Sequence, residues 1–589
     1  MTDTFRPTEP TTRMQALLFA ALAALMAVHL VVRAFVVPIT HEEALRFFAW
    51  VQPAVQPIDH PLSGWWAMVS TALVGPALFP QRVLSLLAFV LFAGYAFRLG
   101  GLVQDVLLRW CLWIALLLMP FAVEMFALAG GQSLAMAFTF MALWHLGRIP
   151  HEPGSRHVLR AALAFVAVAF SATAMQPLWL VGELAVLVVV LRSGAADRWT
   201  RLGTWALVAV LSGLLLHMGF DAKGTDAEWY VAEKLRTWMD LVFATHAQWL
   251  VWSLVLSLGC MAWLGLVGGP YSGGGPRTVL LSTLALLVGW PSLYFAFQAP
   301  TDLVHDALPW LPLFLLGWGL ALDRAIVAGA HRRWLALLLL LPALHMVLGI
   351  HVGTTRSSGD GAIPPKFEAE VLLRQQQAGR GLVVGGGVRQ MPSWEYGRLF
   401  DQEPLTTLQT DHIALEEADL LLVSRWQADD ASTRFHTVLE GPGGLTLMVR
   451  NAAHSTTTVL DTSISFATSD AEYRELPLPA TATLTGRALS FDLSGVLLLD
   501  RRPAEGPFLV VEVNNADMGH AYYGSRSIGQ YPRGRQGLPL RITHVLPPIP
   551  VEAQRVAIYI WNPARVPLSL QKARLHILQR NAPETQAKE

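Results

Sequence analysis

Residues 41–61 read HEEALRFFAWVQPAVQPIDHP and lie between two long apolar stretches. Two adjacent acids begin the segment, aromatic residues follow, and an Asp-His-Pro turn ends it. Acidic side chains held against a membrane are costly unless they bind or react with something. We therefore expect the chemistry of the chain here, and its candidate catalytic residues are Glu42, Glu43, Asp59 and His60.

The composition is that of a membrane protein. Of 589 residues, 53% are hydrophobic and 15% are charged, whereas a typical soluble domain has about 25% charged residues. The net charge is zero, which argues against a nucleic-acid partner. The two cysteines, Cys111 and Cys260, fall inside apolar runs and have no metal-ligand spacing, so we expect packing roles for both.

The apolar runs predict a polytopic bundle of about eleven transmembrane helices. The first covers residues 14–37 and lacks a cleavage motif, so we expect it to be retained as a span. Residues 63–80 are short, Trp-led and bounded by proline, which favours an interfacial helix. Further spans are expected to begin near Arg82, Leu107, Gln132, His157, Pro177, Leu202, Gln248, Val279, Leu308 and Trp334.

Charge sorting among the loops predicts the topology. Arginines concentrate in alternate loops, and acidic residues concentrate in the opposite ones. The positive-inside rule then places the N-terminus in the cytoplasm and the part after residue 354 outside it. For a bacterium, this predicts a multi-pass protein of the inner membrane with a periplasmic C-terminal part.

The fold class that we predict is a polytopic α-helical membrane protein followed by two soluble domains. Strand-like runs around one helical segment indicate a small α/β unit, and later short alternating strands indicate an antiparallel β-sandwich. The predicted parts are a cytoplasmic tail (1–13), a transmembrane domain (14–353) with an external loop (38–81), the α/β domain (354–455), the β-sandwich (456–580) and a tail (581–589).

The residues of the loop leave two interpretations open. Neighbours on a helix point about 100° apart, so one of Glu42 and Glu43 would act as base or cation ligand and the other as an orienting or structural partner. Equally, both are solvated charges that mark the outer side. Asp59 and His60 would contact a phosphate-bearing or hydroxyl-bearing substrate, would support Glu42, or would cap the helix that follows.

Five elements of this region carry a resemblance to a known family. They are Glu42-Glu43-Ala44, the aromatic run Phe47-Phe48-Ala49-Trp50, the turn Asp59-His60-Pro61-Leu62, the apolar segment 64–78, and Arg82 at the start of the next span. The run resembles the first external loop of GT-C glycosyltransferases that use polyprenyl-phosphate sugars, especially protein O-mannosyltransferases and lipid A aminoarabinose transferases. The resemblance covers roughly the first 350 residues and is most specific over 38–150.

The resemblance implies a GT-C fold with its site at the external membrane surface. There the acidic pair would activate the acceptor, and the lipid phosphate would be the leaving group. The substrate-binding candidates are Arg82, Gln132, Gln176 and His305, together with Glu124. A carboxylate at Glu124 is costly in a membrane unless it is paired or faces a cavity, so Glu124 would line a cavity or would have a packing or interfacial role. Gln132 and Gln176 stand where many members place an Asp and a Lys. A divalent cation between Glu42 and Asp59 would also be compatible with the family.

Three functions follow as hypotheses. The first is transfer of a sugar from a polyprenyl-phosphate carrier to an envelope lipid, glycan or protein. The second is a non-catalytic descendant of the fold that acts as a scaffold or protein partner in envelope polysaccharide assembly. The third, a transporter, lacks support because the sequence shows no inverted repeat. Membrane lipids are partners in every case.

The predicted sandwich contains an aromatic group of its own. Tyr522, Tyr523, Tyr531 and Trp561 would form a platform for sugars, or would pack in the core and at the edges.

Overall fold

The chain divides into two compact units, each described by itself. The first comprises residues 1–36, 59–66 and 81–352, and the second comprises residues 37–58, 67–80 and 353–589. The computed structural model describes residues 12–40, 43–44, 47, 61–74, 77–172, 175–193, 197–219, 258–259, 261–263, 274–297, 310–328, 330–340, 363–378, 380–387, 390–398, 408–409, 418–424, 428, 431–441, 445–451, 456–500, 507–515, 519–528 and 537–581.

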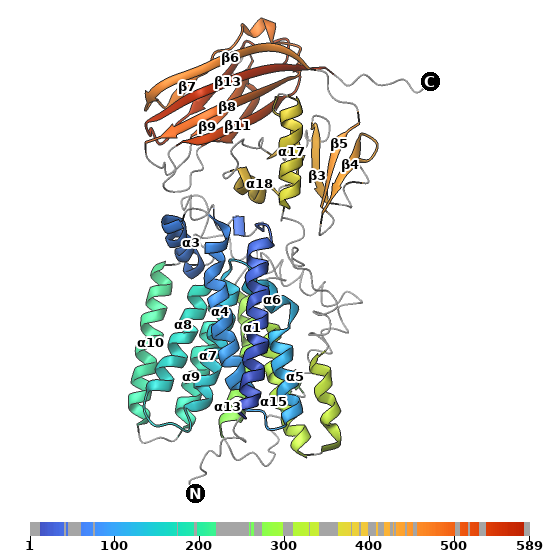
Figure 1. Cartoon of the computed structure of the whole chain (residues 1–589). Coiled ribbons are helices and arrows are strands. Elements are labelled where there is room, and N and C mark those ends of the chain that lie inside the picture. Colours follow the sequence, from blue (N-terminus) through green and yellow to red (C-terminus); the bar gives the residue numbers. More distant parts are fainter. Residues whose placement is uncertain are drawn as a thin grey trace. The chain divides into compact units, whose positions relative to one another are not determined.

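The first unit is a bundle of apolar helices that run side by side (Figure 1). Helices begin within a few residues of most of the predicted starts, and the start near Gln248 lies outside the described residues. The elements are α1 (Arg13–Val36), α4 (Leu78–Gly100), α5 (Val106–Leu117), α6 (Pro120–Ala127), α7 (Gly131–Arg148), α8 (Arg156–Ser171), α9 (Gln176–Arg192), α10 (Arg198–Gly219), α13 (Gly274–Phe297), α15 (Trp310–Ala328) and the 3-10 helix η2 (Ala330–Leu340). Helix α3 (Pro61–Val74) covers most of the predicted interfacial segment.

Helix length and surface chemistry identify a membrane-embedded unit. Within the described part, α1, α4 and residues 198–216 of α10 are long and apolar enough to cross a bilayer. Large apolar side chains on these helices face outward, and Leu25, Val90 and Leu207 are each more than half exposed. Water would penalise such a surface, whereas lipid chains would cover it.

The predicted third span is interrupted. One span was expected from Leu107, but α5 ends at Leu117 and α6 begins at Pro120. Proline has no backbone N–H and cannot continue a helix through its own position, although it suits a first helical turn. Met119 accordingly has an extended backbone, and Glu124 therefore lies in the short second helix.

Small residues let the helices approach closely. A side chain on Gly182 of α9 would overlap the ring of Phe165 in α8, and one on Gly319 of α15 would overlap Leu112 in α5. Such positions are typical of helix packing in membranes, where van der Waals contact drives association. Aromatic rings fill the space between α4, α6 and α7, and Phe92 lies 5.3 Å from Phe126 and 4.7 Å from Phe140 between ring centroids.

The second unit contains a five-stranded sheet with the order β2-β1-β3-β5-β4. Its strands are β1 (Val384–Gly386), β2 (Leu408–Gln409), β3 (Leu420–Ser424), β4 (Phe435–Glu440) and β5 (Leu445–Arg450). The first two pairings are parallel, and β5 pairs antiparallel with β3 and β4. Helices α17 (Pro365–Ala378) and α18 (Met391–Arg398) pack Phe367, Val371 and Trp394 against Leu420 and Leu422.

Two four-stranded sheets follow, with the orders β10-β9-β12-β7 and β11-β8-β13-β6. Their strands are β6 (Thr456–Ser469), β7 (Tyr473–Glu475), β8 (Leu489–Leu499), β9 (Phe508–Asn514), β10 (His520–Ser527), β11 (Leu538–Leu546), β12 (Arg555–Trp561) and β13 (Leu568–Arg580). All the pairings are antiparallel, and alternate apolar residues from both sheets join one buried cluster. The alternating runs of the sequence fall in β8, β9, β11, β12 and β13, and two of these runs form the single strand β8.

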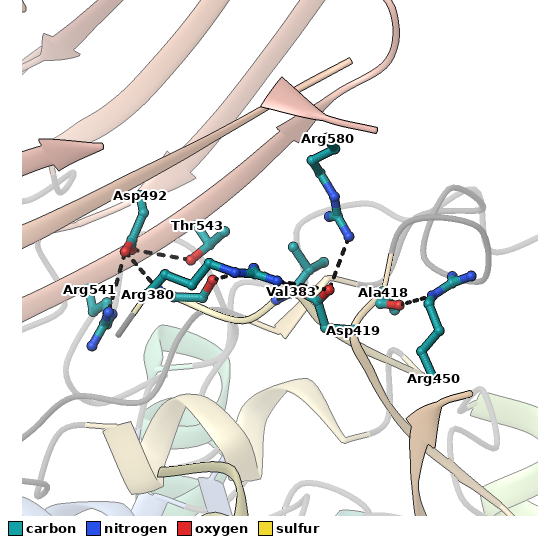
Figure 2. Close-up of polar contacts among 10 residues, drawn as sticks. Arg380, Val383, Ala418, Asp419, Arg450, Asp492, Arg541, Thr543 and Arg580 are labelled. Carbon is teal, nitrogen blue, oxygen red and sulfur yellow. Dashed lines mark hydrogen bonds and ion pairs between the residues drawn. The ribbon is translucent and has the colours of Figure 1, made fainter. Parts of the chain in front are cut away.

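Buried ion pairs join the five-stranded sheet to the outer face of β8, β11 and β13 (Figure 2). Asp419 accepts hydrogen bonds from Arg380 and Arg580, both at 3.2 Å, and from the Val383 amide at 3.0 Å. Burial acts to raise the pKa of Asp419, but Arg580 and Arg380 hold it below its ordinary value. The carboxylate is thus charged, buried and paired twice.

A second buried carboxylate fixes the same junction. Asp492 of β8 accepts the Gly381 amide at 2.8 Å and the Arg541 guanidinium at 3.3 Å. A side chain on Gly381 would come within 2.4 Å of Thr543 Oγ1. Glycine is therefore required where the chain crosses this face, and the two parts of the second unit are locked by polar contacts.

We predict that Asp419→Asn lowers the free energy of unfolding of the second unit by about 3 kcal/mol at pH 7, because breaking a buried pair strands the partner charges. The folded-state pKa of Asp419 is depressed, so its stabilisation exists above the unfolded pKa of about 3.9 and disappears as the pH falls through the lower folded value. Urea unfolding of the purified chain, followed by limited proteolysis of the β-rich part, measures this.

The matched control is Asp461→Asn, which breaks the exposed pair with Arg574. We expect little change from it, because solvent screens exposed pairs. Equal losses from both substitutions, or a loss at Asp419 that persists unchanged at low pH, would contradict the role assigned to the buried pair.

Candidate functional site

The predicted site residues divide between the two units and the undescribed segments. Glu42, Asp59, His60 and His305 lie outside the described residues. Glu43 belongs to the second unit, whereas Arg82, Glu124, Gln132 and Gln176 belong to the first. The predicted roles of all nine residues remain predictions, and the described ones show what surrounds them.

Glu43 forms a capping box with Thr40. The Thr40 amide donates to Glu43 Oε2 at 3.1 Å, and the Glu43 amide donates to Thr40 Oγ1 at 3.3 Å. The Ala44 amide also donates to the Thr40 carbonyl at 3.0 Å, which begins a helical turn. Glu43 is buried. Glu43 therefore caps this turn, and the T-x-x-E spacing was the sequence signal for the cap.

Apolar residues anchor the same segment within the second unit. Ile39, Ala44 and Phe47 join the buried cluster of the two four-stranded sheets. The Phe47 ring meets Tyr396 of α18 edge-on, with 5.0 Å between centroids and 83° between planes. The capping box and this ring contact thus hold the residues on both sides of Glu42 in the sequence.

In the first unit, two buried guanidiniums lie at the C-terminal end of α1. Arg82 of α4 is fully buried and donates from Nη1 to the Ala34 carbonyl at 2.9 Å. Carbonyls in the last turn of a helix have no partner within the helix, and they carry partial negative charge. Arg33, in the last turn of α1, lies 3.9 Å from Glu124 of α6. Arg82 and Glu124 therefore meet the same helix end.

Hydroxyl groups extend this polar cluster to the N-terminus of α7. Ser133 Oγ lies 3.0 Å from Ser85 Oγ, and it donates to the Gly130 carbonyl at 2.9 Å. Ser85 follows Arg82 by one helical turn and so shares its side of α4. Gln132 precedes Ser133 and is buried. Gln132 and Arg82 were predicted from the sequence, whereas the two serines that link α4 to α7 were missed.

Gln176 lies at the same end of the bundle. Short connections join α7 to α8 and α8 to α9, so successive helices reverse direction and the N-termini of α7 and α9 share one end. Gln176 is the first residue of α9 and is half-buried. All the described substrate-binding candidates thus lie at one end of the helices, where helix N-termini present partial positive charge.

The opposite end of α7 carries a different polar cluster. His157 Nε2 donates to Glu152 Oε2 at 2.7 Å, His145 Nδ1 lies 2.9 Å from His157 Nδ1, and the Tyr95 hydroxyl lies 3.4 Å from His145 Nε2. A proton on His145 Nδ1 satisfies every contact with both imidazoles neutral. Burial acts to raise the pKa of Glu152, but the hydrogen bond from His157 and the nearby charges of Arg148 and Arg156 together lower it. The chain of contacts ties three segments together.

No metal centre is evident in the described part of the chain. Among those residues, no group of three or more His, Cys, Asp or Glu could hold a metal ion. The predicted cation ligands Glu42 and Asp59 lie outside the described residues, so a divalent cation there remains a prediction.

Comparison with solved structures finds ArnT and two arabinosyltransferases. ArnT from Cupriavidus metallidurans bound to undecaprenyl phosphate matches with 14% identity and a TM-score of 0.40, over 74% of this chain and 98% of ArnT. Arabinosyltransferase EmbB from Mycobacterium smegmatis matches with 14% identity and a TM-score of 0.35, over 96% of this chain and 64% of EmbB. The chain is similar to both structures at low identity.

A third match is the arabinofuranosyltransferase AftD from mycobacteria, with 11% identity and a TM-score of 0.38, over 96% of this chain and 60% of AftD. No protein-family model and no curated protein sequence matches the chain. At these identities and scores, the matches describe a resemblance.

We predict that Glu43→Gln unfolds at nearly the same temperature as wild type and keeps its activity within twofold of wild type, because glutamine also satisfies a capping box. Glu43→Ala should cost about 1 kcal/mol of stability through the lost cap. Thermal unfolding in detergent and an activity assay on the same samples measure both effects. Loss of activity in Glu43→Gln with unchanged unfolding would show that the carboxylate itself reacts, contrary to the structural role.

Proposed function

We propose that this chain is a membrane glycosyltransferase. It would move a sugar from a polyprenyl-phosphate carrier to an envelope acceptor on the periplasmic face of a bacterial inner membrane. The observation that carries the proposal is the buried polar cluster of Arg33, Arg82, Glu124 and Ser133 at one end of the helices. Helix α1, which carries Arg33, is followed in the sequence by the acidic loop.

The chemistry of this cluster suits a lipid phosphate. Arginine binds phosphate through a planar fork of donors, and a guanidinium has five N–H groups. Burying charge in a membrane protein is expensive, and such residues commonly mark a substrate path. The serines and the glutamines would supply hydrogen bonds to the sugar.

The distribution of arginines supports the proposed side. Residues at the opposite end of the helices include Arg98 in the last turn of α4, Arg148 in the last turn of α7 and Arg192 in the last turn of α9. The positive-inside rule assigns that end to the cytoplasm. The cluster at Arg82 would then face the periplasm. The same rule would place the residues after 354 outside the cytoplasm, where they would present or receive the acceptor.

Glu42 is the proposed base or acceptor-orienting carboxylate. It would hydrogen-bond an acceptor hydroxyl and take its proton as the oxygen attacks the anomeric carbon, while the bond to the lipid phosphate breaks. Asp59 and His60 would shape the acceptor pocket, and His305 would contact the donor. One displacement with no covalent intermediate inverts the sugar carbon. Lipid-linked sugar needs no nucleotide outside the cytoplasm.

We predict that Glu42→Gln lowers transfer by at least a hundredfold, because general-base catalysis contributes about 10²–10⁴. Chain reconstituted in liposomes with radiolabelled polyprenyl-phosphate sugars and periplasmic-type acceptors provides the assay. Glu440→Gln, an exposed acidic position on β4, is the matched control and should transfer like wild type. Transfer that survives in Glu42→Gln would overturn its role. No transfer by wild type with any donor would overturn the enzyme and favour the scaffold hypothesis.

We further predict that Arg82→Gln raises the KM for the lipid-linked donor at least tenfold, because charge-assisted hydrogen bonds are worth about 1.5–3 kcal/mol. The donor KM of Arg82→Lys should lie between those of wild type and Arg82→Gln, since lysine keeps the charge but loses the planar fork of donors. Helical unfolding temperature is recorded for each variant, since Arg82 also contacts Ala34. An unchanged donor KM in a folded Arg82→Gln chain would remove Arg82 from the donor site.

A further inference from the structure

The outer face of sheet β10-β9-β12-β7 carries a mixed aromatic and polar surface. In β9, Leu509, Val511 and Val513 point into the shared apolar cluster. Side chains alternate along a strand, so Phe508, Val510, Glu512 and Asn514 share the opposite face. The same alternation in β12 places Tyr559 and Trp561 on this outer face, since Ile558 and Ile560 belong to the cluster.

Strand register brings the aromatic residues together across the sheet. Trp561 is opposite both Phe508 and Tyr473, and Tyr523 is opposite Glu512. The Phe508 and Trp561 rings lie 5.3 Å apart, and the Tyr473 and Tyr559 rings lie 5.9 Å apart. Two of these rings stand clear of the surface, because Tyr473 is 57% exposed and Tyr523 is 49% exposed.

A fixed polar group occupies the centre of the same face. Glu512 accepts from Asn514 Nδ2 at 2.6 Å and from the Tyr559 hydroxyl at 3.1 Å. His520 Nδ1 lies 2.8 Å from Asn514 Oδ1 and 3.3 Å from Glu512 Oε1. Burial and the Glu512 charge raise the pKa of Tyr559, so the phenol keeps its proton and donates. These contacts hold the carboxylate and amide in place before any ligand arrives.

We propose that this face binds a neutral glycan, stacked on Tyr473 and Tyr523 and hydrogen-bonded to the Glu512–Asn514–His520 group. A sugar ring has an apolar C–H face that packs on an aromatic ring and a rim of hydroxyls that donate to carboxylate and amide oxygens. The inference does not depend on transferase activity. It assigns the second unit an accessory site that would hold a glycan chain.

The dimensions and charges of the face favour a neutral oligosaccharide over other occupants. Four strands at a spacing of about 4.8 Å put β10 and β7 about 14 Å apart, which exceeds the size of a single sugar ring. The charged side chains at the margin, Arg555 and Glu475, are paired with each other. An anionic polymer would meet the Glu512 carboxylate, and a purely apolar partner would have to desolvate the polar group.

The structure also separates the aromatic residues that the sequence grouped together. Tyr522 points inward, and its hydroxyl lies 2.7 Å from Nε2 of His544, which is buried. Burial and the nearby Arg526 lower the pKa of His544 to about 4, so this contact is made by a neutral imidazole. Tyr531 lies outside the described residues. Tyr523 and Trp561 share the outer face, and Tyr473 and Tyr559 complete it.

Binding of the detergent-solubilised full chain to immobilised neutral polysaccharides tests the proposal. The probes are a linear β-1,4-glucan, an α-1,6-mannan and an α-1,6-glucan, read by biolayer interferometry. We expect wild type to bind at least one probe and the double variant Tyr473→Ala/Tyr523→Ala to bind it at least tenfold more weakly. Glu512→Gln should weaken binding at least threefold. Leu373→Ala, an exposed apolar position on α17, is the matched control and should bind like wild type.

Three results would overturn the proposal. Wild type that binds none of the probes would do so, as would a double variant that binds like wild type. Light scattering supplies the third: a wild-type dimer that dissociates on Tyr473→Ala/Tyr523→Ala would show that a second copy covers this face. Donor transfer is measured in a separate assay. The outcome of the binding test and the outcome of the transferase test are therefore independent.

Discussion

A guanidinium buried at the end of a membrane helix is the constraint on which the arrangement of the first unit depends. Arg82 reaches the Ala34 carbonyl from a neighbouring helix, and Arg33 lies beside Glu124 of α6. Such charges are tolerated in a membrane protein only when partners surround them. The ends of α1, α4 and α6 must therefore meet, and the break before Pro120 lets α6 begin at this place. Packing and proposed chemistry share the same residues.

The acidic loop that follows α1 is constrained differently. Thr40 and Glu43 close a capping box, and Phe47 inserts beside Tyr396 within the second unit. A pair of adjacent acids thus separates into one with a structural role and one, Glu42, that the proposal gives to catalysis. The cap between Thr40 and Glu43 fixes the local backbone without using the Glu42 carboxylate. Buried carboxylates also join the two parts of the second unit. Asp419 pairs with Arg580 of β13, and Asp492 of β8 accepts the Gly381 amide.

Much of the fold was predictable from local patterns. Apolar runs predicted the helices, and alternation predicted most strands, because both reflect burial along a single element. The break at Pro120 was missed, since proline is tolerated in many membrane helices. Strand β8 runs without interruption from Leu489 to Leu499, through Gly495. Its pairing with β11 and β13 on either side maintains it.

The candidate site was less predictable. Arg82, Glu124 and Gln132 were selected from the sequence, and they lie at one end of the bundle. Ser85 and Ser133 were missed, because a serine in an apolar helix gives no signal until its partner is known. The aromatic residues of the outer face were predicted only in part. Tyr523 belongs to this face and Tyr522 does not, because strand register turns neighbouring side chains to opposite faces. Long-range pairing, which one sequence does not contain, decided both cases.

Photocrosslinking tests most directly where the lipid phosphate binds. A polyprenyl phosphate with a photoreactive group next to the phosphate is irradiated with the reconstituted chain, and the modified peptides are mapped by mass spectrometry. We expect labels at the C-terminal end of α1, the first turns of α4 and the start of α7, and competition by unlabelled polyprenyl phosphate but not by polyprenol. Labels confined to the α7–α8 connection around Glu152, at the opposite end of the helices, would contradict the proposed site.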